Sequence, residues 1–310
     1  MLPSPSLPPG GRRTPAADRL PGFPGAEHWR REERSGLHYV DHGSGDVVLM
    51  LHGNPTWGYL WRRLITGLAG DFRCVVPDQL GMGLSQRTAG AAPIPLAQRL
   101  EHLDALAAHL IEQHRAPSAG WTLAVHDWGG PIGLAWARRH PGLVTKLVVL
   151  NSVGFRWPEG YRLPRSLALL RDVRPLGEAA HRLNVFPRAA LRAGVVRPLP
   201  AEVRSAYLRP YRSAWQRRAV RDFLRQIPRS GADPAWSLVD PGGDSADLAA
   251  LPVFIGWGLR DPVFTPLVLR EWRRRLPHAE VHAFADAGHF VLEDAGESLI
   301  RPLRRFLSTR

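Results

Sequence analysis

The sequence predicts an α/β protein with a mostly parallel central sheet, helices on both faces and a helical cap. The first observation is that short apolar, β-branched runs alternate with helix-length amphipathic segments from about residue 36 onward. This alternation is typical of parallel strands joined by right-handed crossovers. The second is that residues 154–244 interrupt it with Pro-punctuated helical segments and no strand-like run. We therefore assign the core to 27–153 and 245–310. Because the interruption leaves from a strand's carboxyl end, we expect 154–244 to cover the functional site as a cap.

The expected strands are near-continuous apolar runs, as strands covered on both faces require. They lie at 36–43, 46–53, 72–77, 121–126, 143–152, 251–258 and 279–285. The core helices have apolar residues three and four positions apart and are expected at 59–68, 96–114, 131–140, 267–276 and 297–307. The cap helices are expected at 165–173, 176–186, 187–194 and 201–227. Because ligands bind beyond the carboxyl ends of parallel strands, the residues that close each strand are the site candidates.

The N-terminal residues 1–26 differ in composition from the rest of the chain. They are rich in Pro, Gly and Ala and lack the apolar segment of a signal peptide, so we expect a disordered leader. No apolar run approaches the roughly 18 residues that a transmembrane helix needs, and we expect no such helix. The chain has one cysteine, Cys74, which excludes a disulfide within the chain and suits a cytoplasmic location.

The formal net charge is +13 and comes almost entirely from arginine. The arginines occur as scattered pairs, such as Arg217-Arg218, rather than as one stripe, so nucleic acid is not an expected partner. On the cap they form either a solvated face or a docking surface for an acidic protein partner, a pathway enzyme or an anionic membrane. The 13 histidines show no metal-ligand spacing, and "GMGLS" at 81–85 lacks the third glycine of a dinucleotide fingerprint. We expect neither a metal nor another cofactor.

Asp127, in "AVHDWGG", occupies the turn between a buried strand and an apolar helix. A nucleophile at such an elbow prefers small residues two positions before and after it, because the turn is crowded. Gly129 meets this preference and Val125 does not. A carboxylate with an ordinary pKa of ~3.9 is ionised at neutral pH, so it can attack carbon without a base and form an ester. The alternative role for Asp127 is to cap the following helix.

Two further residues complete the arrangement that an ester intermediate needs. His289, in "DAGHFVLEDA", follows the last strand and is the expected base that activates water against the ester carbonyl. Asp261, in "GLRDPVF", lies just past another strand and is the expected acid that orients the imidazole; its alternative role is to begin a turn before Pro262. The chain order Asp127, Asp261, His289 is the nucleophile–acid–base order of α/β hydrolases.

Asn54 and Trp128 indicate which reaction the nucleophile serves. Asn54, in "HGNPTW", lies beyond an early strand, where oxyanion donors are expected, and its backbone can act with the Trp128 backbone N–H. The Asn54 amide and the Trp128 indole N–H are also expected to face the same space, where two neutral donors suit a weakly basic leaving anion such as a halide. Packing beneath the cap is the alternative role for Trp128.

The motifs "HGNPTW", "PDQLGMGLS", "VHDWGG", "GLRDPVF" and "AGHFVLEDA" together resemble the haloalkane dehalogenase branch of α/β hydrolases. The resemblance covers nearly the whole predicted core and cap. It implies the α/β-hydrolase fold, with the cap following strand 6 in that fold's numbering. It also implies these roles: Asp127 nucleophile, His289 base, Asp261 acid, and Asn54 with Trp128 as halide or oxyanion donors.

Within this branch, "VVLNSVGFRWP", the cap stretch 197–228 and "EWRRRLPHAEVHAFADAGHFVLEDAGE" look most similar to the β-lactone decarboxylases of bacterial long-chain olefin synthesis. The leading prediction is therefore conversion of a small hydrophobic substrate, a dialkyl β-lactone, into an olefin and carbon dioxide. Haloalkane dehalogenation is the second. Epoxide hydrolysis, which would need a cap tyrosine such as Tyr161, Tyr207 or Tyr211, and a catalytically silent binding protein are further alternatives.

Overall fold

The structure, a computed structural model, describes residues 20–309 apart from 89–91, 115, 244 and 246–247. Its centre is an eight-stranded sheet in the order β1-β2-β4-β3-β5-β6-β7-β8. The strands from β4 to β8 are mutually parallel, whereas β2 pairs antiparallel with both of its neighbours. The strand bounds are β1 (Trp29–Glu32), β2 (Leu37–His42), β3 (Asp46–Leu51), β4 (Phe72–Pro77), β5 (Trp121–Asp127), β6 (Val144–Ser152), β7 (Val253–Gly258) and β8 (Glu280–Phe284).

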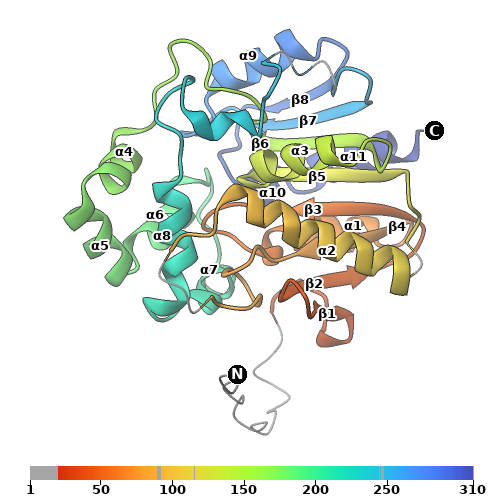
Figure 1. The fold of residues 1–310 in the computed structure, drawn as a ribbon, viewed down its shortest axis with the longest axis horizontal. Helices are drawn as coiled ribbons and strands as arrows, with labels where there is room; N and C mark the ends of the chain where they lie inside the picture. The colour runs from red at the N-terminus through yellow and green to blue at the C-terminus, as the bar shows by residue number, and fades with distance from the viewer. Residues whose placement is uncertain (1–19, 89–91, 115, 244, 246–247, 310) are drawn as a thin grey trace, which may run out of the picture.

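Helices cover both faces of the sheet. α2 and α3 pack side by side in front of it in Figure 1, and α1 packs with α11 behind it. The bounds are α1 (Arg62–Leu68), α2 (Leu96–His114), α3 (Gly129–Arg139), α9 (Pro266–Arg275), α10 (Val291–Asp294) and α11 (Glu297–Ser308). Strands β3, β5 and β7 are buried along nearly their whole length, as expected for a sheet covered on both faces. The predicted fold class is confirmed. Within the described ranges, no helix combines the length and apolarity needed to cross a membrane.

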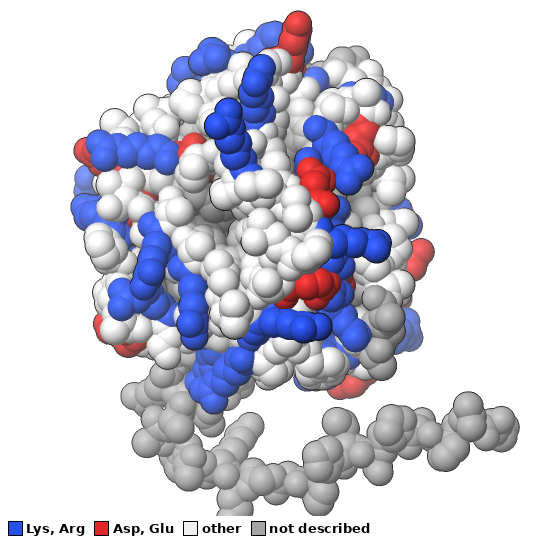
Figure 2. Space-filling model, turned by 90° about the vertical axis from the view of Figure 1, so that its left-hand side faces the viewer, with Lys and Arg blue, Asp and Glu red and all other residues white. Residues whose placement is uncertain are grey.

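The cap lies between β6 and β7, at one end of the sheet (Figure 1). Its helices are α4 (Arg165–Asp172), α5 (Arg174–Arg182), α6 (Val185–Ala193), α7 (Ala201–Leu208) and α8 (Arg218–Arg225). The charged side chains visible on this side of the molecule are mostly Lys and Arg (Figure 2). The single helix expected over 201–227 is instead α7, two short 3₁₀ turns and α8. Pro210 lies in the first turn, and a proline removes a backbone donor and disfavours helix in the residue before it.

The expectation of a leader up to residue 26 is wrong for its last seven residues, while residues 1–19 lie outside the described residues. Leu20 is buried, and the Tyr59 hydroxyl donates to the Pro21 carbonyl at 2.8 Å. The Phe23 ring packs edge-on against Trp57, with 5.4 Å between centroids. The Pro- and Gly-rich composition hid these apolar anchors. Strand β1 was also missed, because a four-residue edge strand with three charged residues carries no apolar run.

Candidate active site

The turn that carries Asp127 is a crowded elbow between β5 and α3. Asp127 has a backbone φ of 51°, a left-handed conformation that is strained for a residue with a side chain. A Cβ on Gly129 would approach the Leu51 carbonyl oxygen to 2.0 Å, so only glycine fits there. Val125, the departure from the usual elbow pattern, is fully buried in β5. The Val125 side chain fits because Gly133 of α3 faces it without a side chain. An added Cβ on Gly133 would lie 2.9 Å from Val125.

The structure brings Asp127, Asp261 and His289 together from the ends of three strands. His289 Nδ1 lies 2.9 Å from Asp261 Oδ2, and its Nε2 lies 3.7 Å from Asp127 Oδ2. All three residues are buried. The imidazole thus has an acid behind one nitrogen and the elbow carboxylate in front of the other, which is the arrangement of a nucleophile, a base and an orienting acid.

The three groups change one another's protonation. Burial raises the pKa of Asp127, against the opposing effect of His289 and two backbone N–H donors. Burial favours the neutral form of His289, but the Asp261 and Asp127 carboxylates outweigh it and raise the pKa of the imidazole. Burial likewise acts against charge on Asp261, yet the imidazole and its hydrogen-bond donors hold the pKa of that carboxyl below its ordinary value. Asp261 is therefore the permanent anion of the site.

The backbone N–H of Asn54 donates to Asp127 Oδ1 at 2.6 Å, and the Trp128 backbone N–H also donates to the carboxylate. Both donors thus contact the Asp127 carboxylate, which is the geometry that an oxyanion pair would need for an ester on this residue. The Asn54 side chain differs from the expectation. Its Nδ2 donates to the Val220 carbonyl of α8 at 3.1 Å, because a buried amide needs a partner. It thereby ties the oxyanion loop to the cap.

Three residues that the sequence analysis did not assign hold the site in place. Asn151 at the end of β6 donates to Asp261 Oδ2 at 2.8 Å. His126 Nε2 lies 2.9 Å from the His289 carbonyl oxygen, and burial lowers the pKa of His126 to about 3, so the ring is neutral and donates there. Asp294 accepts from the Gly288 backbone N–H at 2.9 Å. Asn151 could have been found from the sequence because it lies at the end of a predicted strand. No pattern in the sequence marks His126 or Asp294 as site residues.

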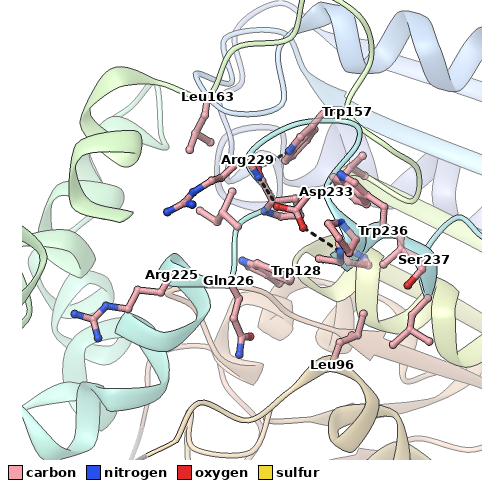
Figure 3. A pocket seen from close by; sticks show the side chains of 18 of the residues that line it. Leu96, Trp128, Trp157, Leu163, Arg225, Gln226, Arg229, Asp233, Trp236 and Ser237 are labelled. Atoms are coloured by element: carbon pink, nitrogen blue, oxygen red, sulfur yellow. Dashed lines mark hydrogen bonds between the residues drawn. The ribbon is translucent and has the colours of Figure 1, made fainter. Parts of the chain in front are cut away.

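Asp127 and Trp128 line a cavity of about 540 Å³ between the sheet edge and the cap (Figure 3). Its walls are mainly apolar and include Leu96, Val153, Trp157, Ile227, Trp236 and Phe264. The Trp128 ring also packs against Phe223 of α8, with 5.3 Å between centroids, so it both lines the cavity and supports the cap. Arg225 and Arg229 belong to the lining segment, but their guanidinium groups point away from the cavity in Figure 3. The cavity suits an uncharged, largely hydrocarbon ligand.

The tyrosines that epoxide chemistry would require are engaged elsewhere. Tyr161 donates to the Val263 carbonyl, Tyr207 to Glu293 and Tyr211 to the Thr56 carbonyl. None of the three lines the cavity beside Asp127 within the described part of the chain. None of these three tyrosine hydroxyls is therefore placed to protonate an oxirane oxygen in the cavity.

Part of the arginine-rich cap is architectural. The Arg217 side chain is buried and donates to the carbonyl oxygens of His181, Arg182, Tyr211 and Arg212. Arg221 and Arg225 both pair with Glu178. Arg217 thus fastens the cap segments to one another and cannot belong to a docking surface.

The fold and the elbow geometry agree with the match to known proteins. Residues 46–296 match the family model described as the alpha/beta hydrolase fold, and the chain belongs to the α/β-hydrolase family. Among its relatives is the cis-3-alkyl-4-alkyloxetan-2-one decarboxylase of Xanthomonas campestris, which is 44% identical over 87% of this chain and 92% of that protein. The Shewanella oneidensis protein of the same name is 36% identical over 92% and 89%.

A second group of relatives consists of haloalkane dehalogenases. That of Mycobacterium marinum is 31% identical over 93% of this chain and 96% of its own. The crystal structure of the haloalkane dehalogenase DbeA from Bradyrhizobium elkani superposes with a TM-score of 0.72 at 26% identity, covering 88% of this chain and 94% of that one. The predicted resemblance is confirmed, and the chain is an enzyme of this family rather than a silent binding protein.

Proposed function

We propose that this enzyme converts a cis-dialkyl β-lactone into an olefin and carbon dioxide. The observation that carries the proposal is the 44% and 36% identity to two oxetan-2-one decarboxylases, against 31% to the haloalkane dehalogenase of M. marinum at similar coverage. The apolar cavity beside Asp127 supports a substrate with two alkyl arms. A four-membered lactone is strained, so its ring opens readily on attack by a carboxylate.

In the proposed reaction Asp127 attacks the ring carbon that carries the ring oxygen. The bond between this carbon and the ring oxygen breaks, and its electrons go to the oxygen. The attacked carbon now carries an aspartyl ester, and the neighbouring carbon carries a free carboxylate. The carbon–carboxylate bond then breaks, its electrons form the olefin, and the ester oxygen departs with its own electron pair. Carbon dioxide leaves and the Asp127 carboxylate is regenerated. No water is consumed, so the atoms balance without a hydrolytic step.

The other site residues take supporting roles in this proposal. The N–H groups of Asn54 and Trp128 hold the carbonyl oxygen of the aspartyl ester, and so stabilise it as a leaving group. His289, whose pKa is raised, serves as a cationic partner for the carboxylates that form and depart. Asp261 keeps the imidazole in that state and orientation.

Haloalkane dehalogenation is the second candidate, favoured by the haloalkane dehalogenase relatives. There Asp127 displaces a halide from carbon to form the ester. His289 then removes a proton from water, and the water oxygen attacks the ester carbonyl to release an alcohol. This route needs the neutral imidazole, whereas the decarboxylation does not.

Separate assays with a dialkyl β-lactone and a bromoalkane distinguish the two functions. We expect olefin and carbon dioxide from the first in stoichiometric amounts, with no label entering Asp127 in H₂¹⁸O. Bromide release without olefin formation would overturn the proposal. His289→Ala sharpens the test: it should stall bromoalkane turnover at an ester on Asp127 that mass spectrometry detects, while lactone turnover loses rate without accumulating that ester.

We further propose a cytoplasmic location. The support is chemical: the one cysteine, Cys74, is buried as a free thiol. Fractionation of the producing cells, with marker enzymes for each compartment, tests it.

A further inference from the structure

The cap exposes an unusual number of large aliphatic side chains in one short segment. Of the seven large hydrophobic residues that are exposed among the described residues, five lie between positions 169 and 185: Leu169, Val173, Leu176, Leu183 and Val185. Leu183 is 69% exposed and Leu169 50%. Single exposed leucines are ordinary, but a cluster marks a surface that meets something other than water.

All five residues are exposed, and they lie on α4 and α5 or within three residues of the ends of these helices. Leu169 lies on α4 and Leu176 on α5, whereas Val173 and Leu183 are the residues that directly follow these two helices. Gly177 and Ala180 form the buried side of α5. Helices α4 and α5 pack against each other, and in Figure 1 they form the part of the molecule farthest from the sheet. We call residues 165–185 the α4–α5 face.

The charge around this face is positive and unneutralised. Arg165, Arg174 and Arg182 are exposed and form no ion pair among the described residues. The two acidic residues of the face, Asp172 and Glu178, are each held by two arginines. Figure 2 shows this side of the molecule with uncharged surface at its centre and mostly Lys and Arg around it.

We propose that the α4–α5 face rests on an anionic lipid bilayer, with the leucines at the acyl boundary and the arginines on the headgroups. Exposed aliphatic residues among basic ones are the composition of an interfacial helix. A second copy of the chain would set arginine against arginine. A protein partner would be met by aromatic residues, which protein interfaces favour over Leu and Val; the apolar residues of this face are all aliphatic.

The face is joined directly to the wall of the active-site cavity. Arg171 of α4 donates to the carbonyls of Ile227 and Pro228 at 3.3 and 3.2 Å, and these two residues line the cavity. Arg229, from the same segment, pairs with Asp172 at 3.1 Å. If the proposed function holds, a dialkyl substrate that partitions into a bilayer would have a short route from the membrane into the cavity.

Flotation with vesicles tests the docking independently of turnover. The full chain is mixed with vesicles of phosphatidylcholine alone, or of phosphatidylcholine with phosphatidylglycerol. We expect flotation with the anionic vesicles only, weakening as salt rises because exposed charges are screened. Arg174→Ser/Arg182→Ser should lower the partition coefficient roughly tenfold or more, and Leu169→Ser/Leu183→Ser by a similar factor.

The matched control is Arg273→Ser/Arg301→Ser, which removes two exposed arginines on α9 and α11, away from the cap; it should float as the wild type does. Thermal unfolding confirms that each variant is folded. Absence of flotation, equal flotation with both vesicle types, or cap variants that bind as the wild type does would overturn the proposal and leave a protein partner to be sought. A negative result here would not bear on lactone turnover, which is assayed without vesicles.

Discussion

The sheet edge and the cap both bury charged groups, but they hold them in different ways. At the sheet edge, the charges of Asp127, Asp261 and His289 face one another within hydrogen-bonding or near-bonding distance. In the cap, the hydrogen bonds that the buried guanidinium of Arg217 donates within the described residues all go to backbone carbonyls. The first arrangement leaves charges that can change state during a reaction. In the second arrangement a permanent cation satisfies the backbone carbonyls of helix ends and turns. Buried charge therefore serves chemistry at the sheet edge and stabilises the fold in the cap.

The largest effect should follow from removing the nucleophile at the sheet edge. Asp127→Ala removes the carboxylate that forms the ester in the proposed reaction, so lactone turnover should fall at least about 10³-fold. Asp286→Asn is the control, since Asp286 is exposed and pairs only with Arg260 among the described residues; it should keep wild-type kcat. Product formation measured by gas chromatography checks both. Turnover by Asp127→Ala within tenfold of the wild type would mean that the ester is not on the pathway.

The architectural role of the cap arginine gives the next effect. Arg217→Ala leaves four backbone carbonyls without their charged donor, so the free energy of unfolding should fall by about 2–4 kcal/mol. Arg182→Ala removes an exposed side chain from the same contact region but keeps the backbone carbonyl of residue 182. It should change the free energy of unfolding by less than about 0.5 kcal/mol. Urea unfolding measures both. Equal losses of unfolding free energy in the two variants would show that the buried Arg217 does not stabilise the cap as proposed.

The sequence predicted the sheet edge far better than the cap, for a physical reason. Parallel strands need continuous apolar runs, and the residues after them gather at one edge, so Asp127, Asp261 and His289 could be assigned from position and residue type. Cap helices are short and their arginines look alike in a sequence. Whether Arg217 is buried against carbonyls or Arg182 is exposed depends on how helices pack, which no local pattern records. The same holds for His126, whose partner lies 163 residues away.

A third prediction addresses the junction where the two regions meet. Asp294 accepts from the backbone N–H of Gly288, which precedes His289, and from the Val196 N–H of the cap connection at 3.0 Å. Phe290 N–H also donates to the Gly194 carbonyl at 2.8 Å. Asp294→Asn would present an amide donor to backbone donors, so the loop that carries His289 should shift. We expect kcat to fall roughly tenfold to hundredfold, with little change in KM.

This role is one of positioning, because Asp294 does not line the cavity. A purely structural role would lower stability and leave the pH profile unchanged. The positioning role instead predicts that the acid limb of kcat moves, since the imidazole would leave its place between two carboxylates. Asp286 lies on the connection between β8 and α10 that also carries His289. Asp286→Asn therefore serves again as the control and should leave kcat and the pH profile as in the wild type.

The smallest expected effect is on the pH dependence of turnover, which should depend on the residues of the sheet edge and not on those of the cap. Burial raises the pKa of Asp127, so the nucleophile is lost to protonation at a higher pH than an exposed aspartate would be. Lactone turnover should therefore fall as pH decreases through that raised pKa. The pKa of His289 is raised as well, so bromoalkane hydrolysis, which needs the neutral ring, should fail first, as pH decreases through the imidazole pKa above 6.5. Because both pKa shifts arise at the sheet edge, Arg182→Ser in the cap should leave both acid limbs where they are; a displaced limb in that variant would show that cap charge reaches the site.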